Sequence, residues 1–132
     1  MNLLDTKAEF RKVNYPSKIA DMYDLYFTGT KGAKVYAKFV VRKNIEGKVP
    51  AVLMFHGLSG ASDDWTDLLV YASQGYVAAF MDVRGQGGLS QDVGGVAGTT
   101  NSAPFTRGIE GGTSTIYLCV TYSLIQHYLL KS

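Results

Sequence analysis

Residues 50–83 read PAVLMFHGLSGASDDWTDLLVYASQGYVAAFMDV, and this stretch decides the fold class. Two apolar runs, at 51–55 and 76–83, are typical of strands buried on both faces of a sheet. The apolar positions between them recur at helical spacing: Trp65, Leu68, Leu69 and Ala72. Strand, helix and strand in about 33 residues predict a βαβ unit with a right-handed crossover.

Local signals set the expected limits of the helix. Ser62, Asp63 and Asp64 are residues that favour a helix start, so we expect the helix to begin near them. It should continue to about Gln74, because Gly75 is a typical terminator.

The part of the chain before this unit predicts antiparallel strands. Residues 23–28 (YDLYFT) and 33–41 (AKVYAKFVV) are rich in strand formers, and the turn signal GTKG at 29–32 separates them. Apolar and polar residues alternate in the second run, which indicates a half-buried strand. Residues 1–20 look like an N-terminal arm with helical potential that ends near Pro16. The predicted fold class is therefore α/β, a mostly parallel sheet with an antiparallel edge.

Composition excludes several classes of protein. A chain of 132 residues with 46% apolar and 18% charged residues fits one globular domain. Ten of the thirteen basic residues lie within 1–48, but acidic and apolar residues are interspersed among them. This spacing favours a solvated face over a nucleic-acid partner.

Compartment and membrane signals are weak. The single cysteine, Cys119, excludes an internal disulfide framework and agrees with a reducing compartment, and no continuous apolar secretion signal is visible. Residues 114–130 carry no charge, yet their Thr, Ser, Gln and His content favours a buried helix over a membrane span. We expect a cytoplasmic protein.

The glycine-rich run MDVRGQGGLSQDVGG at 81–95 raises the question of nucleotide binding. A dinucleotide fingerprint needs a third glycine where Ser90 stands, and a helix directly after it, which the sequence does not indicate. Metal ligands are also poorly supplied, because His56 and His127 lie far apart and only one cysteine is present. We expect no cofactor and no metal.

The dipeptide His56-Gly57 directly follows the first apolar run. A buried strand that opens into His-Gly is where α/β-hydrolases place an oxyanion hole, whose donors are backbone N–H groups. Ser59 is a poor candidate for the nucleophile, because the surrounding GLSGA misplaces the second glycine of G-x-S-x-G. For His56 itself we favour a packed histidine that bonds the loop backbone over a catalytic base.

Together, these motifs and the downstream TRGI at 106–109 resemble the acetyl xylan esterase and cephalosporin-C deacetylase family, carbohydrate esterase family seven. The resemblance covers residues 21–109. It implies an α/β-hydrolase that is usually intracellular, is often a ring-shaped hexamer, and uses a Ser-His-Asp triad without a metal. The implied substrates are acetylated xylo-oligosaccharides or related small acetyl esters, with neither nucleic acid nor membrane as a partner.

The resemblance assigns roles to a few positions of this chain. The residue after His56-Gly57 is Leu58, where the family usually has Tyr, and its backbone N–H is the implied oxyanion donor. The RGQG loop of the family, which supports the active-site rim and subunit contacts, corresponds to Arg84, Gly85, Gln86 and Gly87.

The triad itself is absent, since no G-x-S-x-G occurs anywhere in the sequence. We therefore expect 1–132 to be one partial α/β-hydrolase domain, inactive alone, with an arm (1–20), a family-like core (21–109) and a divergent tail (110–132). The alternatives are another α/β-hydrolase, such as a dienelactone hydrolase or a peptidase relative, a non-catalytic remnant, or a nucleotide-binding module.

Overall fold

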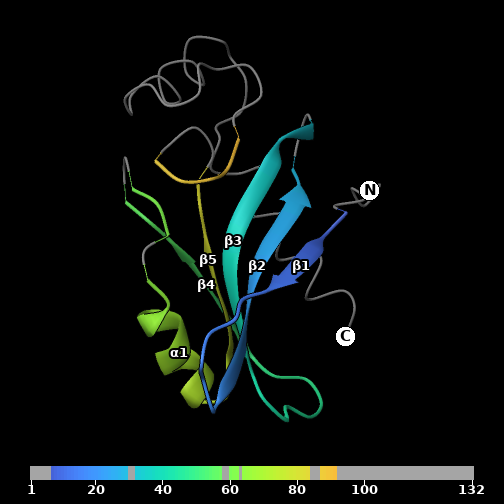
Figure 1. The fold of residues 1–132 in the computed structure, drawn as a ribbon, viewed down its shortest axis with the longest axis vertical. Helices are drawn as coiled ribbons and strands as arrows, with labels where there is room; N and C mark the ends of the chain where they lie inside the picture. Colours follow the sequence, from blue (N-terminus) through green and yellow to red (C-terminus); the bar gives the residue numbers. More distant parts are fainter. Residues whose placement is uncertain (1–6, 30–31, 58–59, 63, 84–86, 92–132) are drawn as a thin grey trace.

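Five strands and one helix make up the part of the chain that the computed structural model describes, residues 7–29, 32–57, 60–62, 64–83 and 87–91 (Figure 1). In chain order they are β1 (Glu9–Lys12), β2 (Ala20–Thr28), β3 (Lys34–Arg42), β4 (Ala51–Phe55), α1 (Thr66–Ser73) and β5 (Val77–Met81). The strands form one sheet in the order β1-β2-β3-β5-β4.

The sheet is mixed, and the predicted α/β class is confirmed. β4 and β5 pair in parallel from Ala51↔Val77 to Phe55↔Met81, with α1 as the crossover between them. The other three pairings, β1–β2, β2–β3 and β3–β5, are antiparallel. The predicted βαβ unit is therefore present, joined on one side to an antiparallel meander.

The predicted hairpin between β2 and β3 is also present. The two strands pair over their full length, from Ala20↔Arg42 to Thr28↔Lys34. The Gly29 N–H closes the turn on the Ala33 carbonyl (2.8 Å), and Gly32 takes a φ of +76°, which favours glycine.

The expected helical potential of the N-terminal arm is wrong for residues 9–12, which form strand β1. A four-residue segment gains little from helical hydrogen bonds, whereas the outer edge of β2 offers a row of backbone partners. Aromatic packing adds to this pairing, because the Phe10 ring lies 6.1 Å from Tyr23 and 5.2 Å from Phe39 between centroids.

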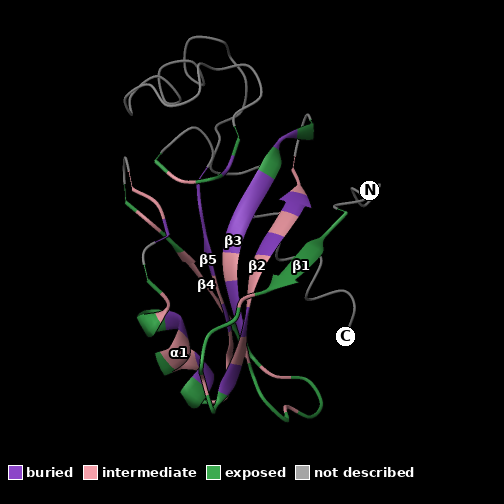
Figure 2. Cartoon of the chain, viewed as in Figure 1, coloured by how far each residue is buried: buried purple, intermediate pink, exposed green. Residues whose placement is uncertain are grey.

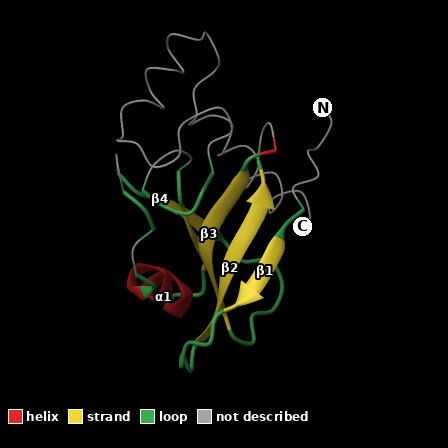
Figure 3. Cartoon of the chain, turned by 45° about the horizontal axis from the view of Figure 1, so that its top comes forward, coloured by secondary structure: helices red, strands yellow, loops and turns green. Residues whose placement is uncertain are grey.

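The expected half-buried character of β3 is wrong as well, because both faces of this strand are covered (Figure 2). Val35, Ala37 and Phe39 belong to the core on one face, whereas Val40 belongs to the core on the other. The second core lies between α1 and the sheet, and it includes Leu68 and Ala72 of α1, which are fully buried. Figure 3 shows the position of α1 beside the sheet. The alternation of residue types in β3 therefore indicates which residues share a face of the strand, but it does not predict whether that face is exposed.

The helix begins at Thr66, later than expected from Ser62 and Asp64. The Asp64 carboxylate accepts a hydrogen bond from the Thr66 backbone N–H (2.7 Å), and this bond lowers the pKa of Asp64. Ser62 is instead buried against the end of β5. Its side-chain type suits a helix cap, but a buried carboxylate takes its backbone N–H.

The two edges of the described sheet differ in character. β1 carries charged, exposed side chains and an ion pair between Arg11 and Glu9 (2.8 Å), which are usual protections against edge-to-edge pairing. β4 is AVLMF, without a charge. It was expected to be buried on both faces, but its middle residues are half-exposed and Phe55 is 41% exposed, since β5 is its one neighbour among the described strands.

None of the described helices is long and apolar enough to cross a membrane. The segment 114–130, for which we expect a buried helix, lies outside the described residues, as does Cys119.

The open edge of β4 leads to a prediction about self-association. We expect the 132-residue chain to form concentration-dependent oligomers, and Phe55→Lys to shift it toward monomer, because a charge on an edge strand opposes pairing. Sedimentation velocity over a range of concentrations measures this. Val70→Lys is the matched control, since Val70 is 50% exposed but lies on α1. A monodisperse wild-type monomer with one sharp unfolding transition would contradict the expectation.

Candidate functional site

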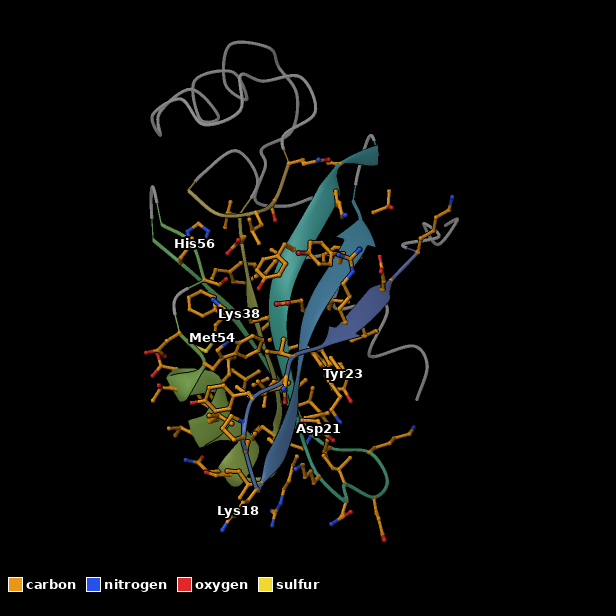
Figure 4. All side chains as sticks on the ribbon, viewed as in Figure 1. Lys18, Asp21, Tyr23, Lys38, Met54 and His56 are labelled. Atoms are coloured by element: carbon orange, nitrogen blue, oxygen red, sulfur yellow. The ribbon has the colours of Figure 1, made fainter. Side chains whose placement is uncertain are left out.

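Two loops meet beyond the C-terminal ends of the parallel strands β4 and β5. We call residues 56–65 the β4 loop and residues 82–91 the β5 loop. In Figure 4, His56 lies at the upper end of β4, and Lys38 and Met54 lie below it toward α1. The carboxyl ends of parallel strands are the usual place for sites in α/β folds, because the loops there converge from neighbouring strands.

His56 joins the two loops through its ring. Its Nε2 accepts a hydrogen bond from the Val83 backbone N–H (2.9 Å), and its Nδ1 lies 2.7 Å from the Gly57 carbonyl oxygen. Since a carbonyl can only accept, Nδ1 must carry the proton, and this assigns the neutral Nδ1–H tautomer. Both ring nitrogens are thus committed to backbone groups, as expected for a packed histidine and not for a base.

A tight turn follows His56. The Gly60 N–H donates to the Gly57 carbonyl (3.1 Å), and the Gly87 N–H of the β5 loop donates to the Gly60 carbonyl (3.1 Å). A side chain on Gly60 would crowd the His56 Cβ at 3.1 Å, whereas a Cβ on Gly57 would meet nothing within 4 Å. The backbone at the exposed Gly57 is therefore open to a molecule that approaches from outside.

The structure also places residues that the sequence did not single out as a site. Asp82 is 1% exposed and its carboxylate accepts backbone N–H groups from both loops, while Ser62 and Ser90 are buried beside it. The available signal was a carboxylate at the end of the apolar run VAAFM, since a charged residue is rarely buried without partners.

The predicted site residues fall into two groups. His56, Gly57 and Gly87 are described, and the hydrogen bonds above bring them together. Leu58, Ser59, Arg84, Gly85 and Gln86 lie outside the described residues, as does His127. The described residues contain no group of three His, Cys, Asp or Glu side chains that could hold a metal ion.

Partly buried polar groups on β3 and its neighbour β2 lie below these loops. The Tyr36 hydroxyl donates to the Asp24 carboxylate (2.7 Å), and burial together with this neighbouring negative charge raises the pKa of Tyr36. The Lys38 ammonium donates to the Ser62 carbonyl (2.6 Å) and lies 5.7 Å from the centroid of the Trp65 ring. The polar side chains below the two loops are thus hydrogen-bonded.

Comparisons with known proteins agree on one family. A family model described as acetyl xylan esterase (AXE1) matches residues 1–126. Acetyl xylan esterase 1 from Thermoanaerobacterium sp. JW/SL YS485 is 50% identical with a TM-score of 0.66, over 74% of this chain and 30% of that one. The acetyl xylan esterase from Paenibacillus sp. R4 is 31% identical with a TM-score of 0.73, over 87% of this chain and 37% of that one.

A more distant likeness supports the fold alone. A cold-adapted esterase from an Arctic intertidal metagenomic library is 12% identical, with a TM-score of 0.57 over 90% of this chain and 50% of that one. No curated protein gives a match. The chain spans 30% and 37% of the lengths of the two acetyl xylan esterases to which it is similar.

The role of His56 in joining the loops can be tested through stability. We expect His56→Ala to lower the free energy of unfolding by about 1–3 kcal/mol, because the part-buried Val83 N–H would lose its acceptor. Urea unfolding followed by Trp65 fluorescence measures the change. Ser73→Ala removes an exposed hydroxyl bond on α1 and should change the value by less than about 0.5 kcal/mol. Equal effects of the two substitutions would contradict the assignment.

Proposed function

The chain belongs to the acetyl xylan esterase family. We propose that it carries the oxyanion hole of a serine carbohydrate esterase, that is, the backbone donor and the loops around it. The proposed reaction removes O-acetyl groups from xylo-oligosaccharides or related small acetyl esters, a class that includes cephalosporin C. The single observation that carries the proposal is the family match over residues 1–126, and the loop geometry at the ends of β4 and β5 agrees with it.

In the proposed mechanism a serine attacks the acetyl carbonyl, and the carbonyl oxygen gains negative charge. The Leu58 backbone N–H, directly after the open Gly57, would donate a hydrogen bond to that oxyanion. A backbone donor suits this task because it costs no side-chain entropy and is already oriented. His56, Gly57 and the loop of Arg84, Gly85, Gln86 and Gly87 would form the rim around the acetyl group.

The nucleophile is the part of the proposal that this sequence does not supply. It contains no G-x-S-x-G, so the serine, its acid and its base would lie outside these 132 residues. We propose that residues 21–109 are the family-like core of one partial domain, which the 30% and 37% coverage of the solved esterases supports. The same absence favours the second candidate, a non-catalytic remnant of such an esterase.

The cellular setting follows from the same resemblance. We propose a cytoplasmic protein, supported by the single cysteine, and a homo-oligomer, a hexamer as the family resemblance implies, for the full-length protein. The proposed partners are the acetyl ester substrate and further subunits, with no nucleic acid, membrane, cofactor or metal.

A chimera tests the proposed function directly. This chain would replace its aligned segment in the Thermoanaerobacterium acetyl xylan esterase, to which it is 50% identical. We expect the chimera to release acetate from acetylated xylo-oligosaccharides, and the 132-residue chain alone to release none from an aryl acetate. A folded but inactive chimera would favour the non-catalytic remnant. Aryl acetate hydrolysis by the chain alone that is lost in Ser59→Ala would instead identify Ser59 as a nucleophile.

Within that chimera, Leu58 separates an oxyanion donor from a structural residue. We expect Leu58→Pro, which removes the backbone N–H, to lower kcat by about 10²–10³. Leu58→Ala is the matched control, because it keeps the N–H and should stay within about threefold of the parent. Circular dichroism establishes that both variants are folded. Equal kcat values for the two variants would remove Leu58 from the mechanism.

A further inference from the structure

Asp82 is the most buried of the described charged side chains in the two loops, and each of its carboxylate oxygens has its own partner. Oδ1 accepts the backbone N–H of Ser62 from the β4 loop (2.5 Å), and Oδ2 accepts the N–H of Leu89 from the β5 loop (2.7 Å). Because Asp82 is only 1% exposed, hydrogen bonds from two backbone N–H groups replace the hydrogen bonds that its carboxylate would make to water. One side chain therefore holds both loops at once.

The β5 loop closes tightly over this carboxylate. A Cβ built on Gly88 would lie 2.0 Å from Asp82 Oδ2 and 2.8 Å from its Cβ, so the backbone passes where a side chain cannot fit. A glycine at this point permits the close approach that brings the following N–H, of Leu89, onto the oxygen. Gly88 in the glycine-rich run is thus explained by contact with a neighbouring acid.

The sheet fixes the position of Asp82 itself. Its backbone N–H donates to the Tyr36 carbonyl of β3 (3.0 Å), and its own carbonyl accepts the Ser90 hydroxyl (2.7 Å). The Ser90 Oγ also accepts the Tyr36 N–H (2.9 Å), so the β5 loop is fastened to the same point of β3. The carboxylate is therefore presented from a rigid support.

The β4 loop is held at Ser62 by two different side chains. Asp82 takes the Ser62 N–H, while the Lys38 ammonium of β3 donates to the Ser62 carbonyl (2.6 Å). At the other end of the loop, His56 is anchored on the Val83 N–H. The β4 loop is thus fixed by hydrogen bonds at His56 and at Ser62, and Leu58 lies between these two residues in the sequence.

We propose that Asp82 is a positioning residue, which couples the β4 loop to the β5 loop through Ser62 and Leu89 and so supports the rim that would carry the proposed oxyanion donor. This inference rests on the proposed function, because it concerns the same rim. Asp82 does not touch the substrate in this proposal. Its requirement is two acceptor oxygens, which a carboxylate has and a carboxamide does not, because the NH₂ group only donates.

Amide hydrogen exchange in the 132-residue chain tests the coupling without any activity. In Asp82→Asn one acceptor is lost, so we expect exchange at Ser62 or Leu89 to rise at least tenfold, and exchange at Gly60 to rise with it. Asp24→Asn is the matched control, since the Asp24 carboxylate of β2 is also hydrogen-bonded but its partner is the Tyr36 hydroxyl and not a loop amide. It should leave all three amides unchanged. Wild-type exchange at Ser62 and Leu89 as fast as in an unfolded peptide would overturn the proposal.

A second variant covers the case in which Asp82→Asn unfolds the chain. Lys38→Met removes the ammonium contact to the Ser62 carbonyl and leaves Asp82 intact. We expect faster exchange at Gly60 and Ser62, with Leu89 unchanged, because Leu89 is held by the other oxygen. Uniform acceleration in β3 and both loops would show general unfolding and would count against a positioning role.

Kinetics in the chimera separate positioning from stability. We expect Asp82→Asn to lower kcat about tenfold, with KM changed less than threefold, because the donor is needed most in the transition state. Unchanged kcat in a folded variant would overturn the proposal. If the chimera is inactive before any substitution, the proposed function fails, while the exchange result still decides whether Asp82 couples the loops.

Discussion

A strand with apolar side chains on both faces can place polar chemistry only where it ends, and this constraint organises the molecule. β5 reads VAAFM and contributes to the cores on both faces of the sheet, so its first available polar position is Asp82. β4 reads AVLMF, and its first polar residue is His56. Because the two strands are parallel and in register, both residues emerge at the same end of the sheet. The parallel pairing of β4 and β5 therefore sets the position of the candidate site, whatever catalytic groups it contains.

Patterns that depend on neighbours in the chain were readable from the sequence. The hairpin at Gly29–Gly32, the crossover helix and both parallel strands were predicted because turns and periodicities are local. Strand β1 was not, since its stability comes from the edge of β2 and from Phe10 packing on Phe39. Tertiary contacts of this kind override the weak helix preference of a four-residue segment.

The same distinction applies to the candidate site. His56-Gly57 and the RGQG run could be proposed as parts of a rim, because they resemble a family. The role of Asp82 could not be identified in this way, because its partners are the backbone N–H groups of Ser62 and Leu89. Every residue except proline has such a group, so the residue types do not reveal it as a partner. The serine at 62 was even misleading, since it suggested a helix cap. In such a network only one member, the acid, carries a signal in the sequence.

The proposed oxyanion site would be separable from its nucleophile. The proposed donor is a main-chain group of the β4 loop, and His56, Asp82 and Lys38 all bond to backbone atoms of the two loops. None of these bonds requires a serine, an acid or a base from elsewhere in the protein. In the proposed esterase, β3, β4, β5 and their loops would therefore supply the electrostatic stabilisation, and a separate nucleophile would carry out the covalent step. Among the described strands, the edge strand β4 carries no charge, whereas charged side chains on β1 protect the opposite edge against pairing.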